Sequence, residues 1–216
     1  MIRWKIAQWF ELKWWKNYLT SKSKPEYIAW KTNYWLSLID SIGQSQRVSK
    51  AKTIADFGCG PFGLALANNN WQKRLVAIDP LLSKYESQIS FFSKADYPAT
   101  SFITKAIEEF GVNEKFDVVF CMNAINHVHD IEKAYDVVCG SCAETGRIII
   151  SIDAHNFAFF KHLFRLLPGD ILHPYQFDLK EYKAFMEVRG FKIIKEHCSK
   201  REFFFDHYVL VASPQQ

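Results

Sequence analysis

The chain has 216 residues, of which 49% are hydrophobic and 23% are charged. This apolar content excludes a disordered chain, and no stretch approaches the ~18 uncharged apolar residues that a membrane-spanning helix requires. The formal net charge of +4 is unevenly distributed, because residues 1–52 carry ten Lys or Arg against three Asp or Glu, whereas residues 53–216 carry 17 against 20. Six of the seven tryptophans also fall within the first 35 residues. The composition therefore indicates a basic, aromatic N-terminal segment joined to a slightly acidic body.

Two helical patterns occupy the N-terminal segment. The apolar spacing over 27–42 is that of an amphipathic helix, and Pro25 suits its first turn. Over 2–19 the apolar side chains instead point to all sides of the helical wheel. Such a helix is either buried on several sides or covers something apolar. We therefore expect residues 1–48 to form a helical lid on the rest of the chain.

Strand and helix patterns alternate from residue 53 onward. Short, continuous apolar runs are typical of strands that are buried on both faces of a parallel sheet. We expect such strands at 53–57, 75–78, 101–104, 116–122, 147–152, 191–195 and 208–212. Helices are expected between them at 62–70, 81–93, 130–143 and 178–189. The pattern predicts a doubly wound, Rossmann-like α/β fold with a mostly parallel sheet, in a domain spanning 49–216.

A glycine-rich turn, DFGCGPFG, directly follows the first of these strands. Its glycines, among them Gly58 and Gly60, allow the backbone to turn sharply and to approach a ligand closely. Asp79 ends the second strand 19 residues after Gly60, where an acid can accept hydrogen bonds from both hydroxyls of a ribose. Ligands of open α/β sheets bind at the carboxyl ends of the strands. The combination therefore predicts a nucleoside site.

Asp56 distinguishes this turn from a pyrophosphate site, since a carboxylate there would repel a pyrophosphate but suits an ammonium group. TIADFGCGPFG resembles motif I of the class I S-adenosylmethionine-dependent methyltransferases, and VAIDPLL resembles their second motif. FDVVFCMNAINHVHDIEKAYDVV resembles their fourth strand and following helix, and GRIIISIDAHN resembles their fifth strand. The resemblance spans roughly 50–212 in the family's order. It implies a seven-stranded sheet with an antiparallel last strand, and S-adenosylmethionine as the cofactor, with S-adenosylhomocysteine as product.

The resemblance also implies positions around that cofactor. Asp56 would lie near the ammonium group, Asp79 would hold the ribose, and Asn123 would face the methionine portion. The full set of cofactor-binding residues implied in this way is Asp56, Gly58, Cys59, Gly60, Asp79, Pro80, Ala106, Ile107 and Asn123. Phe62 departs from the family, because many relatives have glycine there, and its ring could narrow the turn.

Methyl transfer needs alignment of the reactants and, for a hydroxyl acceptor, removal of a proton, for which histidine is the usual base. Candidate bases are His127 after the fourth strand, His155 after the fifth, and His173 before the next helix, with His129 as a further possibility. We expect an inserted cap at 154–178, because this connection is far longer than the ~2–6 residues of an ordinary α/β loop.

The leading hypothesis is a small-molecule methyltransferase that acts on an oxygen, while nitrogen and carbon acceptors remain open. One alternative is a methyltransferase that acts on RNA or at a membrane surface through the basic, Trp-rich segment. It is weakened because a surface-binding helix needs a clear polar face. The other alternative is a non-catalytic protein that binds S-adenosylmethionine. We expect no nucleic-acid partner, and the oligomeric state is not readable from the sequence.

The five cysteines are an odd number, which argues against a disulfide framework and for a cytoplasmic location. Cys139-x-x-Cys142 has the spacing of a metal or redox site, but it has no partner motif and is expected to pack within a helix. No metal site is expected. Arg3 and Lys5 precede Glu11 without a small-residue cleavage site, so no secretory signal is expected.

Overall fold

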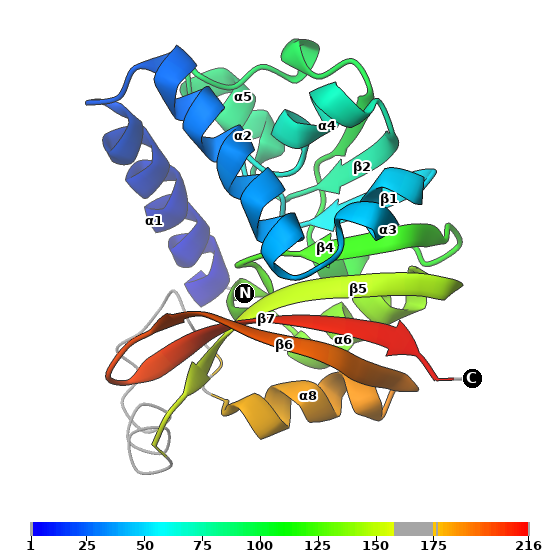
Figure 1. Ribbon diagram of the computed structural model, residues 1–216. Helices are drawn as coiled ribbons and strands as arrows, with labels where there is room; N and C mark the ends of the chain where they lie inside the picture. The colour runs from blue at the N-terminus through cyan, green and yellow to red at the C-terminus, as the bar shows by residue number, and fades with distance from the viewer. Residues whose placement is uncertain (1, 158–174, 176, 216) are drawn as a thin grey trace.

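The computed structural model describes residues 2–157, 175 and 177–215. A seven-stranded sheet with the order β3-β2-β1-β4-β5-β7-β6 forms the centre of the molecule (Figure 1). The strands are β1 Thr53–Phe57, β2 Arg74–Ile78, β3 Thr100–Ile103, β4 Phe116–Cys121, β5 Cys142–His155, β6 Phe191–Arg201 and β7 Phe205–Pro214. Strands β1 to β5 pair in parallel, and β7 is antiparallel to both of its neighbours. The expected Rossmann-like sheet with an antiparallel last strand is confirmed.

Helices cover both faces of this sheet (Figure 1). Two separate groups of buried apolar side chains show this division, one shared with α1 to α5 and the other with α6 and α8. The helices are α1 Ile2–Leu19, α2 Lys24–Ser41, α3 Ser45–Lys50, α4 Ala65–Trp71, α5 Leu82–Gln88, α6 Ile131–Gly140 and α8 Leu179–Glu187. Short 3-10 turns are η1 Lys94–Asp96, η2 Ile107–Glu109 and η3 Ile125–His127.

Alternation along the strands determines which side chains face which group of helices. On β5, Ile149 belongs to the core shared with α1 to α5, whereas Ile148 and Ile150 belong to the core shared with α6 and α8. Because side chains two residues apart point to the same face, the polar residues Ser151 and Asp153 continue the first of these faces. The carboxyl end of β5 therefore presents polar groups on the side of the sheet that α1 covers.

The N-terminal helix α1 has the limits expected from its sequence. Leu12 and Leu19 are buried against the body, whereas Trp9 and Trp14 are each 54% exposed. Its apolar residues thus fall on two sides with different environments, which explains the all-round apolar pattern. The short helix α3 was not expected, because six residues carry too weak a periodic signal.

The boundaries around β5 differ from those expected. Helix α6 ends at Gly140 and β5 begins at Cys142, so Cys139-x-x-Cys142 does not lie within one helix. Both thiols are nevertheless buried, as packing requires, and all five cysteines are free. Most of the expected cap at 154–178, including His173, lies outside the described residues. Among the described helices, none combines the length and apolar character needed to cross a bilayer.

Candidate functional site

The glycine turn joins the carboxyl ends of three strands. The Gly58 amide donates to the Ile78 carbonyl at the end of β2 over 2.8 Å. Gly58 has a φ of +68°, and a Cβ atom added to it would lie 2.1 Å from the Cβ of Ala124, just beyond β4. Gly60 has a φ of +57°. Glycine is therefore required here both for the left-handed backbone and for the close packing of the turn on the loop after β4.

Asp56 stabilises the turn from inside. Its carboxylate is only 2% exposed, and Oδ2 accepts a hydrogen bond from the Leu64 amide over 2.8 Å. A Cβ on Gly63 would lie 2.4 Å from this oxygen, so glycine makes room for the carboxylate. Burial raises the pKa of Asp56 to about 7, an effect that the Lys31 ammonium partly opposes. Asp56 thus has a structural task, and its expected place near the cofactor's ammonium group stays a prediction.

Asp79 stands at the end of β2, as the strand pattern predicted. Its Oδ2 accepts from the Gly60 amide over 3.0 Å, and its Oδ1 accepts from the Leu81 amide over 2.7 Å. A carboxylate has about four acceptor positions, so these two bonds leave capacity for ribose hydroxyls. Burial raises the pKa of Asp79 to about 7, and the nearby Glu11 carboxylate raises it further. Asp79 and the glycine turn therefore fit the nucleoside portion of S-adenosylmethionine.

Helix α1 contributes two residues to this site that the sequence analysis did not identify. The Tyr85 hydroxyl, on α5, donates to Oε1 of Glu11 over 2.8 Å, and burial raises the pKa of Glu11. Trp15 lies one turn further along, with its Cζ2 atom 3.9 Å from where a Cβ of Gly60 would be. Helix α1 consequently lies over the carboxyl ends of β1 and β2. The signal for this role in the sequence was that Glu11 is the only acidic residue of α1.

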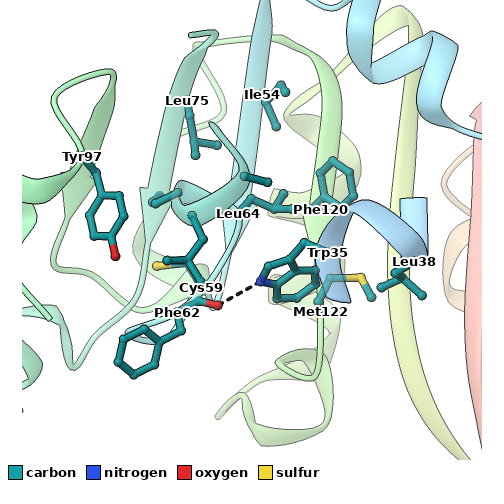
Figure 2. Packing of buried hydrophobic residues seen from close by; sticks show 14 of the residues in the cluster. Trp35, Leu38, Ile54, Cys59, Phe62, Leu64, Leu75, Tyr97, Phe120 and Met122 are labelled. Atoms are coloured by element: carbon teal, nitrogen blue, oxygen red, sulfur yellow. Dashed lines mark hydrogen bonds between the residues drawn. The ribbon is translucent and has the colours of Figure 1, made fainter. Parts of the chain in front are cut away.

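Phe62 connects the turn to the N-terminal helices (Figure 2). Its ring is buried, with its centroid 5.0 Å from that of Tyr27 and 5.6 Å from that of Trp15. Its carbonyl accepts a hydrogen bond from Nε1 of Trp35 over 3.0 Å, drawn as a dashed line in Figure 2. The bulky residue at this position therefore anchors α1 and α2 to the turn.

The remaining expected cofactor residues surround the same edge of the sheet. The Cys59 amide donates to the Ile78 carbonyl over 3.2 Å, and burial raises the pKa of the Cys59 thiol, which keeps it protonated. Pro80 is half-buried directly after Asp79. Ala106 and Ile107 are buried, and Cδ1 of Ile107 lies 3.9 Å from the Cβ position of Gly58.

Glu108 has a local structural role. Its side chain is buried, and Oε1 accepts hydrogen bonds from the His129 amide over 2.7 Å and from the Asp130 amide over 3.0 Å. The acid that follows Ala106 and Ile107 therefore holds the loop after η3.

Asn123 follows β4 with a left-handed φ of +52°. Its amide donates to Oγ of Ser151 over 2.6 Å, and the Ser151 hydroxyl donates in turn to Oδ1 of Asn123 over 2.9 Å. This pair ties the end of β4 to the end of β5. Asn123 is exposed, so its side chain lies at the surface of this edge.

The candidate histidines occupy different environments. His127 is half-buried in η3, whereas His155 is buried at the end of β5 with its ring edge-on to Phe205 at 5.1 Å. His129 is exposed. His173 lies outside the described residues. The structure therefore brings His155, but not all of the histidines, onto the end of the sheet.

A histidine and carboxylate pair at the end of β5 was missed from the sequence. His207 on β7 lies opposite Asp153 on β5, and Nδ1 of His207 is hydrogen-bonded to Oδ1 of Asp153. The other ring nitrogen, Nε2, lies 3.6 Å from Oε2 of Glu202. The partners are 54 residues apart, so only the pairing of β5 with β7 brings them together.

The turn, Asp79 and the polar ends of β4 and β5 lie at one edge of a doubly wound sheet with an antiparallel last strand. This combination defines the class of the S-adenosylmethionine-dependent methyltransferases, in which S-adenosylmethionine is the methyl donor. In the described part of the chain, no group of three His, Cys, Asp or Glu residues is placed to hold a metal ion.

Comparison with known families agrees with this class. Residues 48–173 match the family model described as a methyltransferase domain. The match covers more than half of the chain, and the chain therefore belongs to this methyltransferase family.

Individual relatives are distant. The chain is 30% identical over 98 residues to the ubiquinone biosynthesis O-methyltransferase of Rickettsia felis, a match that covers 45% of this chain and 40% of that protein. A solved S-adenosylmethionine-dependent methyltransferase from Clostridium acetobutylicum has a TM-score of 0.63 at 13% identity, covering 97% of this chain and 99% of that one. The 1,6-didemethyltoxoflavin-N1-methyltransferase of Burkholderia thailandensis, solved with S-adenosylhomocysteine, has a TM-score of 0.56 at 14% identity, covering 90% and 92%. These two structures share the fold of this chain.

Proposed function

We propose that the enzyme transfers a methyl group from S-adenosylmethionine to an oxygen atom of a small, partly apolar molecule. The observation that carries this proposal is the pair His207 and Asp153 at the carboxyl end of β5. Asp153 lies on the same strand face as Ser151, which is bonded to Asn123 beside the expected methionine portion. A histidine oriented by a carboxylate at this place is suited to take a proton from a hydroxyl acceptor.

The residues at the nucleoside end would bind and orient the cofactor. Asp79 accepts from the ribose hydroxyls, and the backbone of Gly58 and Gly60 allows the methionine portion to approach closely. Ala106 and Ile107 line the adenine side. The sulfonium of the bound cofactor supplies an electrophilic methyl group. The main further contribution of the protein is to align the acceptor with this methyl group.

His207 would act as the base. With Nδ1 donating to Asp153, Nε2 would be the atom that accepts the acceptor's proton. Nε2 is buried 3.6 Å from Oε2 of Glu202, so the Glu202 side chain would have to move aside to admit the acceptor. The other proposed bases are His155, on the same face of β5, and His127 in η3. His173, which lies outside the described residues, is also proposed as a base.

Residues 1–48 would form a lid that excludes water from the site, because α1 contacts the turn through Trp15 and approaches Asp79 through Glu11. We include the segment 154–178 as a cap on the acceptor side. The Rickettsia felis relative supports oxygen as the acceptor atom through its name as an O-methyltransferase. The Burkholderia thailandensis structure is named for transfer to a nitrogen, so nitrogen is the second candidate.

The test supplies methyl-labelled S-adenosylmethionine with matched acceptors, a panel of small phenols and the corresponding anilines. We expect label on the hydroxyl compounds. His207→Gln should lower kcat by about 10²–10⁴-fold, while S-adenosylhomocysteine binding by calorimetry stays unchanged.

His197→Gln on β6 is the matched control and should leave kcat unaltered. Label on the anilines alone would assign nitrogen as the acceptor. An unaltered kcat in His207→Gln would move the role of base to His155 or His127, which the corresponding Gln variants distinguish. Binding of S-adenosylhomocysteine without turnover of any acceptor would favour a non-catalytic binding protein.

A further inference from the structure

We propose that the outer surface of α1 and α2 is a peripheral binding site for an anionic lipid bilayer. This surface, called the aromatic face below, consists of exposed apolar side chains at Ile6, Trp9, Phe10, Trp14, Trp30 and Tyr34. The inference does not depend on which acceptor atom is methylated.

The aromatic face is a concentrated apolar surface. Trp9, Trp14 and Trp30 are each 54% exposed, although tryptophan normally buries most of its large apolar area in a folded protein. Exposed apolar side chains scattered singly need no explanation, whereas a contiguous group marks an interaction site. This group lies on the side of α1 opposite to the residues that hold it on the body, such as Leu12 and Glu11.

Ring contacts link the aromatic residues of the two helices. Trp14 stacks on Tyr18 at 4.8 Å between ring centroids, and Tyr18 lies 6.0 Å from Tyr27 on α2. Tyr27 in turn lies 5.7 Å from Trp30, which is 6.2 Å from Tyr34. Tyr18 is half-buried and Tyr27 is buried, so the exposed rings of α1 and α2 are joined beneath the surface into one aromatic cluster.

The charge of the α1 part of the aromatic face complements an anionic partner, whereas α2 is neutral, with Lys24 and Lys31 against Glu26 and Asp40. Glu11 is the only carboxylate of α1, and it points inward, where it accepts from Tyr85. The exposed charged residues on the described part of α1 are Lys5, Lys13 and Lys16. Tryptophan and tyrosine at the level of the headgroups, with lysines reaching the lipid phosphates, form the arrangement by which helices lie in a bilayer surface.

The absence of a single clear polar face on α1 is compatible with binding to a bilayer surface. Helix α1 is apolar on two sides because one side packs on the domain and the other forms the aromatic face. The lysines flank the exposed aromatic residues. An interfacial helix docked on a globular body needs this division, rather than the single apolar stripe of an isolated peptide.

Two other partners fit less well. Single-stranded nucleic acid stacks its bases on open ring faces, but Lys13 covers the Trp9 ring at 5.1 Å and Lys31 covers Tyr34 at 4.2 Å. A second copy of this chain would bring together two segments that each carry ten basic residues against three acidic ones. An anionic bilayer avoids both difficulties.

The test measures co-flotation of the full chain with vesicles of phosphatidylcholine alone and of phosphatidylcholine with an equal amount of phosphatidylglycerol. We expect binding to the anionic vesicles, a blue shift of tryptophan emission, and quenching by brominated acyl chains. The triple variant Trp9→Ser, Trp14→Ser and Trp30→Ser should weaken binding by about tenfold or more, as should Lys5→Glu with Lys13→Glu and Lys16→Glu.

The matched control removes exposed apolar residues elsewhere, with Val188→Ser, Ile194→Ser and Phe203→Ser, and should bind as the unaltered chain does. Thermal stabilisation by S-adenosylhomocysteine verifies that each variant is folded. The inference is overturned if the chain does not float with anionic vesicles, or if the tryptophan variant floats as well as the control. Tryptophan-dependent binding of oligouridine RNA, or of a second copy in light scattering, without vesicle binding would assign the aromatic face to that partner instead.

Discussion

At the scale of single residues, we expect Asp79 to couple cofactor binding to pH. Its raised pKa of about 7 means that much of the unliganded protein carries a proton on this carboxyl below neutrality. Ribose hydroxyls bind best to an ionised carboxylate that accepts from both, so the proton must leave on binding. The affinity for S-adenosylhomocysteine should therefore rise with pH, by up to about tenfold between pH 6 and 8.

Calorimetry at pH 6, 7 and 8 measures this effect. Asp79→Asn should bind weakly and with little pH dependence, because the neutral amide does not titrate. A slope that persists in Asp79→Asn would assign the proton to Asp56, whose pKa is also raised to about 7. An affinity of the unaltered protein that is independent of pH would contradict the coupling.

Gly58 is a residue at which the turn tolerates no larger side chain without a clash. Gly58→Ala introduces a Cβ 2.1 Å from that of Ala124 and places it on a backbone with φ of +68°. We expect the free energy of unfolding in urea to fall by about 2–4 kcal/mol. Adding Ala124→Gly should restore the part due to the clash and leave about 1–2 kcal/mol for the backbone.

Gly111→Ala is the matched control for this pair. No atom lies within 4 Å of its added Cβ, and its φ is not in the left-handed region, so stability should change by less than about 0.5 kcal/mol. Equal losses in Gly58→Ala and in the double variant would show that the contact with Ala124 is relaxed at no cost.

The residues of the site differ in how far the sequence could reveal them. Asp79 and the glycine turn follow their strands directly, so local pattern alone places them at one edge of the sheet. Glu11 and His207 instead depend on partners 74 and 54 residues away. Nothing local to Glu11 shows that α1 will lie on α5, because that contact forms only when the apolar side of α1 is buried.

At the scale of elements, Glu11 and Tyr85 join α1 to α5 through a buried polar contact. Burial raises the pKa of Glu11, so its ionised form is unfavourable in the folded state. Glu11→Gln keeps an oxygen that can accept from the Tyr85 hydroxyl and removes the charge near Asp79. We therefore expect this variant to be more stable than the unaltered protein at pH 8.

The sign of this effect follows from proton linkage. A carboxyl with a raised pKa in the folded state retains a proton that the unfolded chain releases, so its ionisation costs stability as the pH rises. At pH 4 the Glu11 carboxyl is mostly protonated in the folded and the unfolded state, and it is then as neutral as the amide of the Glu11→Gln variant. The gain from Glu11→Gln should therefore vanish. Tyr85→Phe provides the contrast, because it removes the hydroxyl that donates to the carboxyl over 2.8 Å and should destabilise at pH 8. A loss of stability in Glu11→Gln at pH 8 would show that the charge is stabilised in place.

Elements with strong periodic or apolar signals were predicted well, and those set by tertiary pairing were not. The limits of α1 agree with its pattern, and β4 contains the apolar run Val118–Cys121. Strand β5 extends from Cys142 to His155, beyond the apolar core at 147–152 at both ends. Cys142 pairs with Phe116 of β4, and β7 pairs with the polar C-terminal end as far as His155. The same pairing creates the contact between Asp153 and His207, so the missed strand end and the missed site residue have one cause.

At the scale of the whole molecule, α1 is the element shared by the proposed cofactor site and the aromatic face. Its inner side carries Trp15 and Glu11 at the carboxyl ends of β1 and β2, and its outer side carries Trp9 and Trp14. A ligand that binds beneath α1 should therefore order α1 as well as the turn. Helix α8 packs against the opposite face of the sheet and should not respond.

Hydrogen exchange with and without saturating S-adenosylhomocysteine measures this response. If residues 1–48 act as a lid, binding should slow exchange of the amides at 58–63 and also those of α1, because opening of α1 then requires loss of the ligand. The amides of α8 serve as the internal control, and Asp79→Ala should abolish both effects together. Slower exchange confined to the turn, with α1 unchanged, would mean that α1 is a fixed structural layer, and the cofactor would then have to enter by another route.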